Sequence, residues 1–360
     1  MYQMEDLVSV VIPTYNRIKT LPNTIKSVLN QTYKNWELIV VDDLSTDNTE
    51  ELMKYFSNND SRIKYFKNKN KKGPSGARNC GIQNSSGKYI AFLDSDDEWV
   101  PNHLFDSIKA LIEENQDVCF SLWYERDDKG NISKVLSAED DMVRLKKVID
   151  EYKPKINGNL FVFNSSFFEF ISTGNYYCYQ INTMVLKKDV IKSAGLFNEA
   201  LRSSEDVDFI TRVIFNYGFC LIFDYHFIYN RGNDNIYYFM DRQNIDLKKI
   251  IYNSETVKRL SLCDSHKCEM LKLRIKFIKK MAARIGKKEE CLTVTNDRMA
   301  KKYLTLGIIN QRDNRFKAVY YLYNSIIHSY SRKKVKYLLK VLFRFGNKIV
   351  KVDTSELNFL

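Results

Sequence analysis

The sequence predicts an α/β fold in which a mostly parallel sheet is flanked by helices. Continuous apolar and β-branched runs of strand length recur through the first hundred residues, and amphipathic segments of helical period separate them. Polar clusters follow the ends of three of these runs. Parallel strands are buried on both faces by the helices that connect them, so this alternation is typical of a doubly covered sheet.

Each expected element can be placed in order. The first four strands are VSVVIP (8–13), WELIVVDD (36–43), RIKYFK (62–67) and KYIAFLD (88–94). The helices between them are LPNTIKSVLNQ (21–31), TDNTEELMKYFS (46–57) and PSGARNCGIQNS (74–85). A helix over 101–115 and a strand over 118–125 follow. Regular patterns return in 180–197 and in a helix over 203–218, with Ser204 as its expected N-cap.

Charge divides the 360-residue chain into two expected domains. Residues 241–360 carry 28 Lys and Arg against 11 Asp and Glu, whereas residues 1–240 carry 28 against 33. We therefore predict an α/β domain over 1–240 and a basic helical region over 241–360. Residues 126–175 mix charged and aromatic runs without clear periodicity, and we interpret them as an insertion on the acceptor side of the site.

Composition excludes several classes of protein. No run approaches the roughly 18 apolar residues of a membrane-spanning helix. The N-terminus has acids where a secretory signal has bases, and the seven scattered cysteines form no CxxC pair. These features favour a cytoplasmic protein with reduced thiols. No motif supports nucleic-acid binding, a catalytic triad or a zinc site.

Three polar clusters fall at the carboxyl ends of the expected strands, where ligands bind in such sheets. They are Pro13-Thr14-Tyr15-Asn16, Asp42-Asp43 and the acidic run 94–98. Tyr15 offers a flat face for a nucleobase, and an aspartate of the pair can accept from a base or ribose. The alternatives are an ordinary loop aromatic and an N-cap for the next helix.

The run Asp94-Ser95-Asp96 places two carboxylates one residue apart after a buried strand. Such carboxylates can bind Mg²⁺ or Mn²⁺, which prefer oxygen ligands and commonly share substrate phosphates. The competing interpretation is a solvated acidic turn. Asp97 and Glu98 are expected to support the site or to face solvent.

Two further positions carry candidate chemistry. Arg78 and Asn79 lie near the start of a helix, and Arg78 could neutralise the acidic run or a phosphate, or could be a surface arginine. Glu205 and Asp206 lie in the first turn of another helix, where a carboxylate could act as a general base or simply stabilise the helix.

Taken together, these segments resemble family 2 glycosyltransferases of the GT-A type, over about residues 6–230. The resemblance implies that Pro13, Thr14 and Tyr15 contact the nucleobase and its ribose, with Asp43 favoured over Asp42 for base recognition. It implies a ribose or supporting role for Asp94 with Ser95 beside it. The direct ligand of a divalent cation (Mn²⁺ or Mg²⁺) would be Asp96, and the catalytic base would be Asp206 with Glu205 in support.

The implied reaction transfers a sugar, with inversion, from a nucleotide-diphosphate donor to a glycan or lipid-linked acceptor. A UDP-sugar and bacterial capsule, O-antigen or other surface polysaccharide synthesis are expected. The Q-x-x-R-W signature of processive members is missing, so a single-addition enzyme is favoured. Where many members have a loop histidine over the diphosphate, this chain offers Arg231.

The C-terminal region must be interpreted from its residues alone. Residues 335–352 interleave apolar and basic side chains with helical spacing, which predicts a basic amphipathic helix. Such a helix could bind an anionic membrane surface, placing the protein peripherally on the inner face of the plasma membrane. It could equally pack on the catalytic domain or on a second copy in a homodimer.

Two other functions compete with sugar transfer. A sugar nucleotidyltransferase also uses an acidic metal site, but it is expected to carry a Gly-rich basic loop after the first strand, which IPTYNRIKT lacks. A non-catalytic sugar-nucleotide-binding scaffold is the third hypothesis, and the presence of Asp43, Asp96 and Asp206 together disfavours it.

Overall fold

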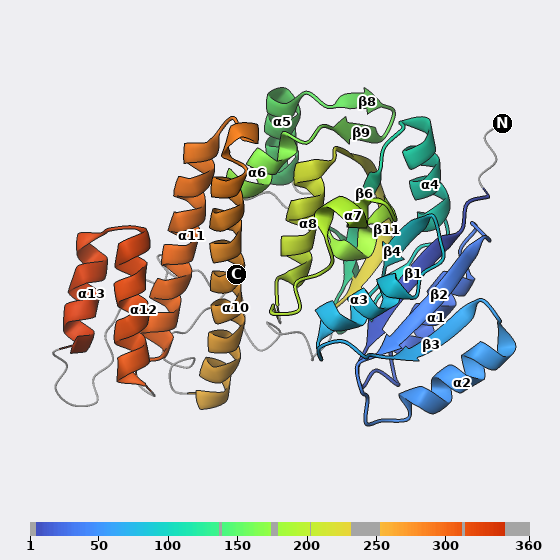
Figure 1. The fold of residues 1–360 in the computed structure, drawn as a ribbon, viewed down its shortest axis with the longest axis horizontal. Helices are drawn as coiled ribbons and strands as arrows, with labels where there is room; N and C mark the ends of the chain where they lie inside the picture. The colour runs from blue at the N-terminus through green and yellow to red at the C-terminus, as the bar shows by residue number, and fades with distance from the viewer. Residues whose placement is uncertain are drawn as a thin grey trace. The chain divides into compact units, whose positions relative to one another are not determined.

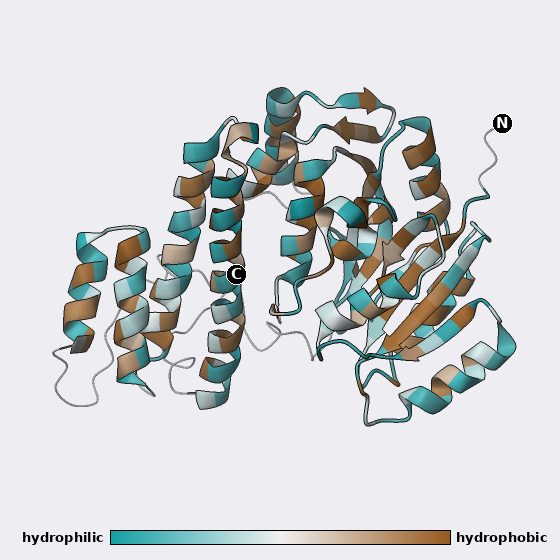
Figure 2. Ribbon diagram, in the orientation of Figure 1, coloured by the Kyte–Doolittle hydropathy of each residue, from teal (hydrophilic) through white to brown (hydrophobic). Residues whose placement is uncertain are grey.

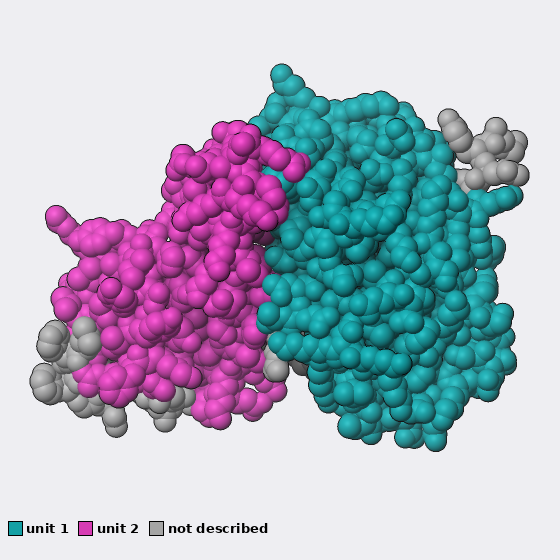
Figure 3. Space-filling model, viewed as in Figure 1, with its two compact units in different colours: residues 1–171, 175–200, 205–232 teal, residues 172–174, 201–204, 233–360 magenta. Residues whose placement is uncertain are grey.

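The computed structural model describes residues 5–136, 139–173, 179–201, 203–231, 253–311 and 314–342. The chain divides into two compact units (Figure 3). Unit 1 comprises residues 1–171, 175–200 and 205–232, and unit 2 comprises 172–174, 201–204 and 233–360. The expected domain boundary at residue 240 falls in 232–252, which lies outside the described residues.

Unit 1 begins with a regular alternation of strands and helices (Figure 1). The elements are β1 (Val8–Thr14), α1 (Leu21–Leu29), β2 (Trp36–Asp42), α2 (Thr49–Asn59), β3 (Ile63–Lys67), α3 (Pro74–Gln83) and β4 (Tyr89–Phe92). Strand β1 pairs in parallel with both β2 and β4, and β2 pairs in parallel with β3. The predicted parallel sheet is confirmed for these four strands.

Later strands extend the sheet and make it mixed. They are β5 (Glu98–Trp99), β6 (Val118–Arg126), β7 (Ile132–Lys134), β8 (Lys155–Asn157), β9 (Leu160–Phe163), β10 (Val185–Lys187) and β11 (Phe219–Asn230). The main order is β3-β2-β1-β4-β10-β6-β11-β9-β8. Strand β10 runs antiparallel to both neighbours, whereas β6 and β11 are parallel to each other. A parallel core thus carries antiparallel additions.

The remaining helices of unit 1 follow the same chain order. They are α4 (His103–Glu113), α5 (Glu139–Tyr152), α6 (Phe167–Thr173), α7 (Val190–Ala194) and α8 (Glu205–Asn216), with a 3₁₀ turn, η1 (Ile181–Thr183). In segment 126–175, for which the sequence shows no clear periodicity, the described residues form two helices and three short strands. Strand β9 pairs with β11, and Phe163 stacks on Phe219. Short strands at a sheet edge leave little periodic signal, because their pairing partners lie far away in the sequence.

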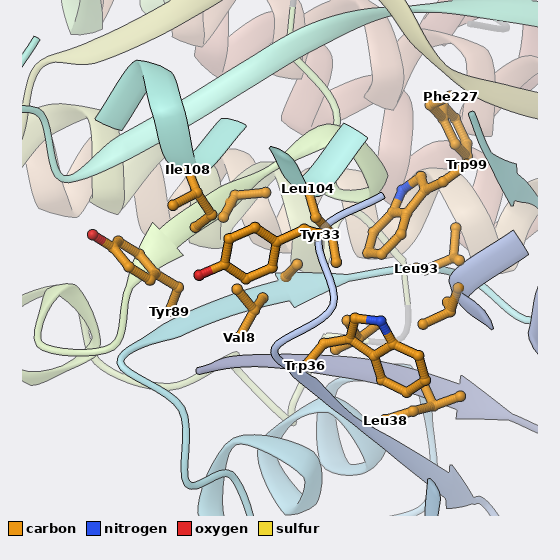
Figure 4. Close-up of a cluster of buried hydrophobic side chains, with 14 of the residues drawn as sticks. Val8, Tyr33, Trp36, Leu38, Tyr89, Leu93, Trp99, Leu104, Ile108 and Phe227 are labelled. Carbon is orange, nitrogen blue, oxygen red and sulfur yellow. The ribbon is translucent and has the colours of Figure 1, made fainter. Parts of the chain in front are cut away.

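Hydrophobic side chains cover the sheet on both faces. On one face, Val8, Val10 and Ile12 pack in a cluster with residues of α1, α2 and α4 (Figure 4). On the other, Val11 packs in a cluster that includes Phe209 and residues of α5 and α8. Strand neighbours point to opposite faces, so one strand supplies both clusters. Figure 2 shows the central strands as largely hydrophobic, which confirms the layered α/β fold.

Unit 2 is helical in its described residues. Its helices are α10 (Ser254–Lys280), α11 (Lys288–Ile309), α12 (Arg315–His328) and α13 (Arg332–Leu342), with a short 3₁₀ turn, η2 (Ala282–Arg284), after α10. Asn253 and Asn314 cap α10 and α12 by accepting from the backbone N–H of Thr256 and Lys317. A buried ion pair joins Lys302 and Asp264 at 3.0 Å.

The predicted amphipathic helix over 335–352 is observed in part. Helix α13 runs from Arg332 to Leu342, and residues 343–360 lie outside the described residues. It packs beside α12, and Val341 is buried there. Among the described helices, none is long and apolar enough to cross a membrane. The six described cysteines are free and buried.

Candidate active site

The three polar clusters meet at the carboxyl ends of β1, β2 and β4. Register places Thr14 opposite Asp42, and the backbone N–H of Asp43 donates to the Thr14 carbonyl at 2.8 Å. Leu93, just before the acidic run, donates from its backbone to Val11 on β1 at 3.1 Å. The parallel pairing therefore brings residues far apart in the sequence to one edge of the sheet.

The loop after β1 presents an aromatic ring. Tyr15 is 43% exposed, whereas Thr14 is buried. Asn16 adopts the left-handed conformation at φ 52° and accepts from the Thr46 backbone at 2.7 Å, which fixes the loop. Lys72 Nζ lies 4.3 Å from the centre of the Tyr15 ring. Lys72 is a contact that the sequence patterns do not reveal.

The two aspartates after β2 have different partners. Asp42 accepts from the Ser45 N–H at 2.8 Å and from the Tyr65 hydroxyl at 2.6 Å, so it shapes the turn. Asp43 accepts from Asn68 Nδ2 at 2.6 Å and from the Gly73 N–H at 2.8 Å. Asp43 thus holds the loop that enters α3. Each carboxylate oxygen of Asp43 can accept a second hydrogen bond, which leaves room for a bond from a nucleobase. Recognition of the nucleobase by Asp43 stays a prediction.

Arg78 links the acidic run to the first turn of α8 through two ion pairs. Its side chain is buried; Nη2 donates to Asp94 Oδ1 at 2.7 Å and Nη1 donates to Glu205 Oε1 at 2.8 Å. Burial alone lowers the pKa of Arg78, but the carboxylates of Asp94 and Glu205 raise it above its usual value. The alternative of a surface arginine is wrong. Arg78 joins the acidic run to the start of α8.

Small residues bring α3 close to the sheet. A Cβ on Gly81 would lie 2.3 Å from Val11 Cγ1, and one on Gly76 would lie 1.9 Å from the Lys71 carbonyl. Asn79 accepts from the Phe197 N–H at 2.9 Å and donates to the carbonyl of the same residue at 3.0 Å. Asn79 thereby holds α3 to the segment preceding α8, and a supporting role in the site stays a prediction.

The acidic run is fixed from several sides. Asn182 contacts Asp94 twice: the Asp94 backbone N–H donates to Asn182 Oδ1 at 2.9 Å, and Asn182 Nδ2 donates to Asp94 Oδ2 at 3.1 Å. The Ser95 carbonyl accepts from Thr20 Oγ1 at 2.9 Å. Asp96 lies 3.2 Å from Arg17 Nη2, and its side chain is 30% exposed. Asp94 is thereby oriented by protein donors, and the side chains of Asp94 and Asp96 are both partly exposed.

The next two acids are supporting residues. Asp97 is buried and accepts from the Asn230 N–H at 2.8 Å; burial raises the pKa of Asp97 well above its usual range, and Asp96 and Asp94 act in the same direction. Glu98 pairs with Arg126 at 2.6 Å. The expectation of support therefore holds, and solvent exposure of Asp97 is wrong.

Beside Lys72, the sequence patterns missed Arg17, Asn182 and Asn230, whose side chains contact the acidic run. Asn182 contacts Asp94 and also Asp97 at 3.3 Å, and Asn230 Nδ2 donates to the Asp96 carbonyl at 2.8 Å. Asn182 sits in a 3₁₀ turn and Asn230 ends β11, where an isolated asparagine carries no distinctive pattern. Only the fold brings them to the acidic run.

The predicted base lies at the start of α8. Ser204 precedes this helix at φ 62°, a conformation that costs energy for a residue with a side chain. Glu205 is buried against Arg78, and Asp206 follows it in the first turn. Burial, followed by the neighbouring Glu205 carboxylate, raises the pKa of Asp206 to about 6, although Arg78 acts in the opposite direction.

Arg231 has another partner in the described residues. Its guanidinium contacts the Glu125 carboxylate, and its backbone N–H donates to the Arg126 carbonyl at 2.9 Å. Arg231 thus closes the pairing of β6 with β11. A role over the donor diphosphate stays a prediction. His226, expected to be structural, is buried, and burial lowers its pKa.

The raised pKa of Asp206 predicts a pH dependence. We expect kcat/KM for transfer to rise with pH and to level off above about pH 6, because only the ionised carboxylate can accept a proton. Stability should show the opposite trend. The folded chain holds this proton more tightly than the unfolded chain, so the contribution of Asp206 to the free energy of unfolding falls between about pH 4 and pH 6. Initial rates and urea unfolding across this range check both trends.

The acidic run can also be tested for its fit to a divalent cation. In the described ranges, no group of three or more His, Cys, Asp and Glu side chains is placed to bind a metal by itself. Mg²⁺ and Mn²⁺ commonly use one or two carboxylates and take further oxygens from substrate phosphates. Asp96 fits that pattern, since its side chain is 30% exposed and its ion pair with Arg17 is itself partly exposed.

The structure thus combines an α/β domain with an acidic run and a partly buried carboxylate, Asp206, near one edge of the sheet. Residues 9–175, just under half of the chain, match the model of glycosyl transferase family 2. The match ends before Glu205 and Asp206, so their placement rests on geometry. The match to the family model also favours sugar transfer over the nucleotidyltransferase alternative.

Named relatives share this segment. The chain is 50% identical over 113 residues to the UDP-Glc:alpha-D-GlcNAc-diphosphoundecaprenol beta-1,3-glucosyltransferase WfgD of Escherichia coli, covering 31% of this chain and 44% of that protein. It is 39% identical over 166 residues to the GalNAc(5)-diNAcBac-PP-undecaprenol beta-1,3-glucosyltransferase of Campylobacter jejuni, covering 45% of this chain and 52% of that protein. The matches therefore span about half the length of each relative.

A solved structure resembles a larger part of the fold. S. aureus TarS residues 1–349 in complex with UDP-GlcNAc align with a TM-score of 0.56 at 16% identity, covering 93% of this chain and 87% of that one. At this identity the likeness concerns the fold, and it confirms the GT-A type architecture.

Proposed function

We propose that the protein transfers a sugar from a nucleotide-diphosphate sugar to a hydroxyl of a lipid-linked or glycan acceptor, with inversion. One observation carries the proposal: Arg78 joins Asp94 to Glu205, which places Asp206 next to the acidic run at the ligand-binding edge of the sheet. The names of the E. coli and C. jejuni relatives support a UDP-sugar donor and a diphosphoundecaprenol-linked acceptor in surface glycan synthesis.

The residues divide the work as follows. Tyr15 stacks on the nucleobase, and Asp43 accepts from its edge. Asp206 accepts the proton of the acceptor hydroxyl as that oxygen attacks the anomeric carbon. The bond from this carbon to the diphosphate oxygen breaks, and its electron pair leaves with the nucleoside diphosphate. One displacement inverts the anomeric centre without a covalent intermediate.

Asp96 would hold the divalent cation together with the donor diphosphate. When bound, Mg²⁺ or Mn²⁺ screens the negative charge that develops on the leaving diphosphate. Arg78 and Asn182 keep Asp94 oriented beside it. Arg17, 3.2 Å from Asp96, would lie close enough to the donor diphosphate to contact its phosphates.

Asp96→Ala is expected to abolish metal-dependent donor binding. In wild type, Mn²⁺ and a UDP-sugar together should raise Tm, because a ligand that binds only the folded state stabilises it. The variant should lose that increase, and EDTA should remove it from wild type. Glu113→Ala, in α4, is the matched control. Donor hydrolysis that is unchanged in Asp96→Ala and insensitive to EDTA would contradict the metal role.

Peripheral membrane binding is part of the proposal. The acceptors in the relatives' names are attached to undecaprenol, a lipid. A single-addition enzyme acting on such an acceptor must reach the membrane surface, and the basic residues of unit 2 are suited to anionic lipids.

A further inference from the structure

Helix α12 carries a row of exposed apolar and aromatic side chains. Phe316, Tyr320, Tyr323 and Ile327 are between 56% and 90% exposed, and Tyr330 follows in the turn after the helix at 72%. Spacings of four, three and four residues place the four helical members on one face. We call these five residues the α12 stripe. Isolated exposed apolar residues are ordinary, but a continuous row of large ones marks an interaction site.

The opposite face of α12 already has its packing partner. Ala318, Leu322 and Ser325 are buried, and Ser325 Oγ donates to the Ala300 carbonyl of α11 at 2.7 Å. A Cβ on Gly307 of α11 would lie 2.6 Å from Leu322, so the two helices approach closely. The helix is therefore held in unit 2 by its small and aliphatic residues. The α12 stripe adds little to that packing.

All Lys, Arg, Asp and Glu residues of the helix hairpin that carries the α12 stripe are basic. Residues 314–342, which span α12 and α13, contain seven Lys and Arg and no Asp or Glu. Lys317, Lys336 and Lys340 are exposed. An exposed aromatic row on a helix hairpin without a single acid matches the chemistry of an anionic lipid surface. Aromatic side chains favour the headgroup region, and Lys and Arg attract anionic headgroups.

Charge also argues against a second copy of this chain. A two-fold interface built on the α12 stripe would place one basic hairpin against another, with no acids in 314–342 to offset the repulsion. Single-stranded nucleic acid could use aromatic and basic side chains together. The named relatives' lipid-linked acceptors favour the membrane.

We propose that the α12 stripe is the surface by which the protein binds anionic membranes. The inference rests on the proposed function for its setting, since a lipid-linked acceptor requires access to the membrane. It differs from the expectation drawn from the sequence, which placed membrane binding in the helix over 335–352. Here the aromatic and apolar side chains of α12 enter the headgroup region, and the bases of α13 contribute attraction.

The test is flotation of the full chain with vesicles. Wild type should float with vesicles of equal amounts of phosphatidylglycerol and phosphatidylcholine, and poorly with phosphatidylcholine alone. Replacing the four helical members together by serine (Phe316→Ser, Tyr320→Ser, Tyr323→Ser, Ile327→Ser) should reduce binding at least about tenfold. Lys336→Glu with Lys340→Glu should weaken binding and its dependence on salt.

A matched control changes four exposed apolar residues outside the α12 stripe and outside segment 126–175 to serine: Tyr55, Phe105, Leu196 and Leu262. This variant should float like wild type. Hydrolysis of the UDP-sugar in vesicle-free buffer should be the same in wild type and both serine variants. If the stripe variant no longer floats but hydrolyses the UDP-sugar at the wild-type rate, the result supports the α12 stripe. If wild type itself does not hydrolyse the UDP-sugar, the result counts against the proposed function.

Three results would overturn the inference. The first is flotation of the stripe variant at the wild-type level. The second is a wild-type dimer, seen by analytical ultracentrifugation, that the stripe substitutions convert to monomer while vesicles are not bound. The third is tight binding of wild type to single-stranded RNA without vesicle binding. Circular dichroism should show unchanged helix content in the stripe variant, because the replaced side chains are exposed.

Discussion

Asp206→Asn should reduce sugar transfer by about 10²- to 10⁴-fold, the usual contribution of a positioned general base. The amide retains the size of the carboxyl group but cannot accept a proton from the acceptor hydroxyl. Donor binding should be nearly unchanged, since the substitution removes no proposed donor contact. Initial transfer rates at saturating donor, combined with calorimetric titration of the donor, separate the two effects.

The control is Asp189→Asn, the same change at an exposed aspartate that precedes α7. It should transfer at the wild-type rate. The increase of kcat/KM that levels off above about pH 6 should disappear from the residual rate of Asp206→Asn, because the titrating carboxyl is gone. If the variant fails to bind donor while remaining folded, Asp206 is a binding residue instead of the base.

Arg78→Met should lower the free energy of unfolding by about 3–5 kcal/mol, the usual cost of removing one partner from a buried ion pair. The guanidinium is buried between Asp94 and Glu205, at 2.7 and 2.8 Å. Methionine would leave the Glu205 carboxylate buried without its partner. Transfer should fall as well, because Asp94 loses its orientation. Urea unfolding measures the first effect.

Two further variants test whether loss of the buried ion pair causes the destabilisation of Arg78→Met. Lys54→Met breaks the exposed pair with Glu50 and should cost less than about 1 kcal/mol. Adding Glu205→Gln to Arg78→Met should restore part of the lost stability, because the charge left without a partner is removed. The single Arg78→Met variant should also raise the apparent pKa of Asp206 above 6, since Arg78 lowers it in wild type. Equal free energies of unfolding for wild type and Arg78→Met would contradict the stabilising role of the buried Arg78 ion pairs.

The alternation of strands and helices in the N-terminal part was predictable because each strand can be recognised from its own residues. Val8, Val10 and Ile12 face one layer of helices and Val11 faces the other, so burial on both faces appears as a continuous apolar run. The three polar clusters were predictable for the same reason, since each follows directly after such a run. Their convergence then follows from parallel pairing alone.

Segment 126–175 was not predictable in this way. Strand β9 is four residues long, and it is stabilised by β11 and by Phe219, both more than fifty residues later in the chain. Local pattern carries little information about a short strand whose partner is distant. The antiparallel insertion of β10 between β4 and β6 has the same origin.

For the site, the kinds of residue can be recognised from the sequence: carboxylates after strands, an arginine early in α3, and an acidic first turn in α8. Their mutual contacts follow from the fold. It buried Arg78 between Asp94 and Glu205, brought Asn182 and Asn230 to the acidic run, and turned Arg231 toward Glu125. The physical reason is that a side chain's charge and size are local properties. Burial, pairing and pKa depend on neighbours that only the folded chain supplies.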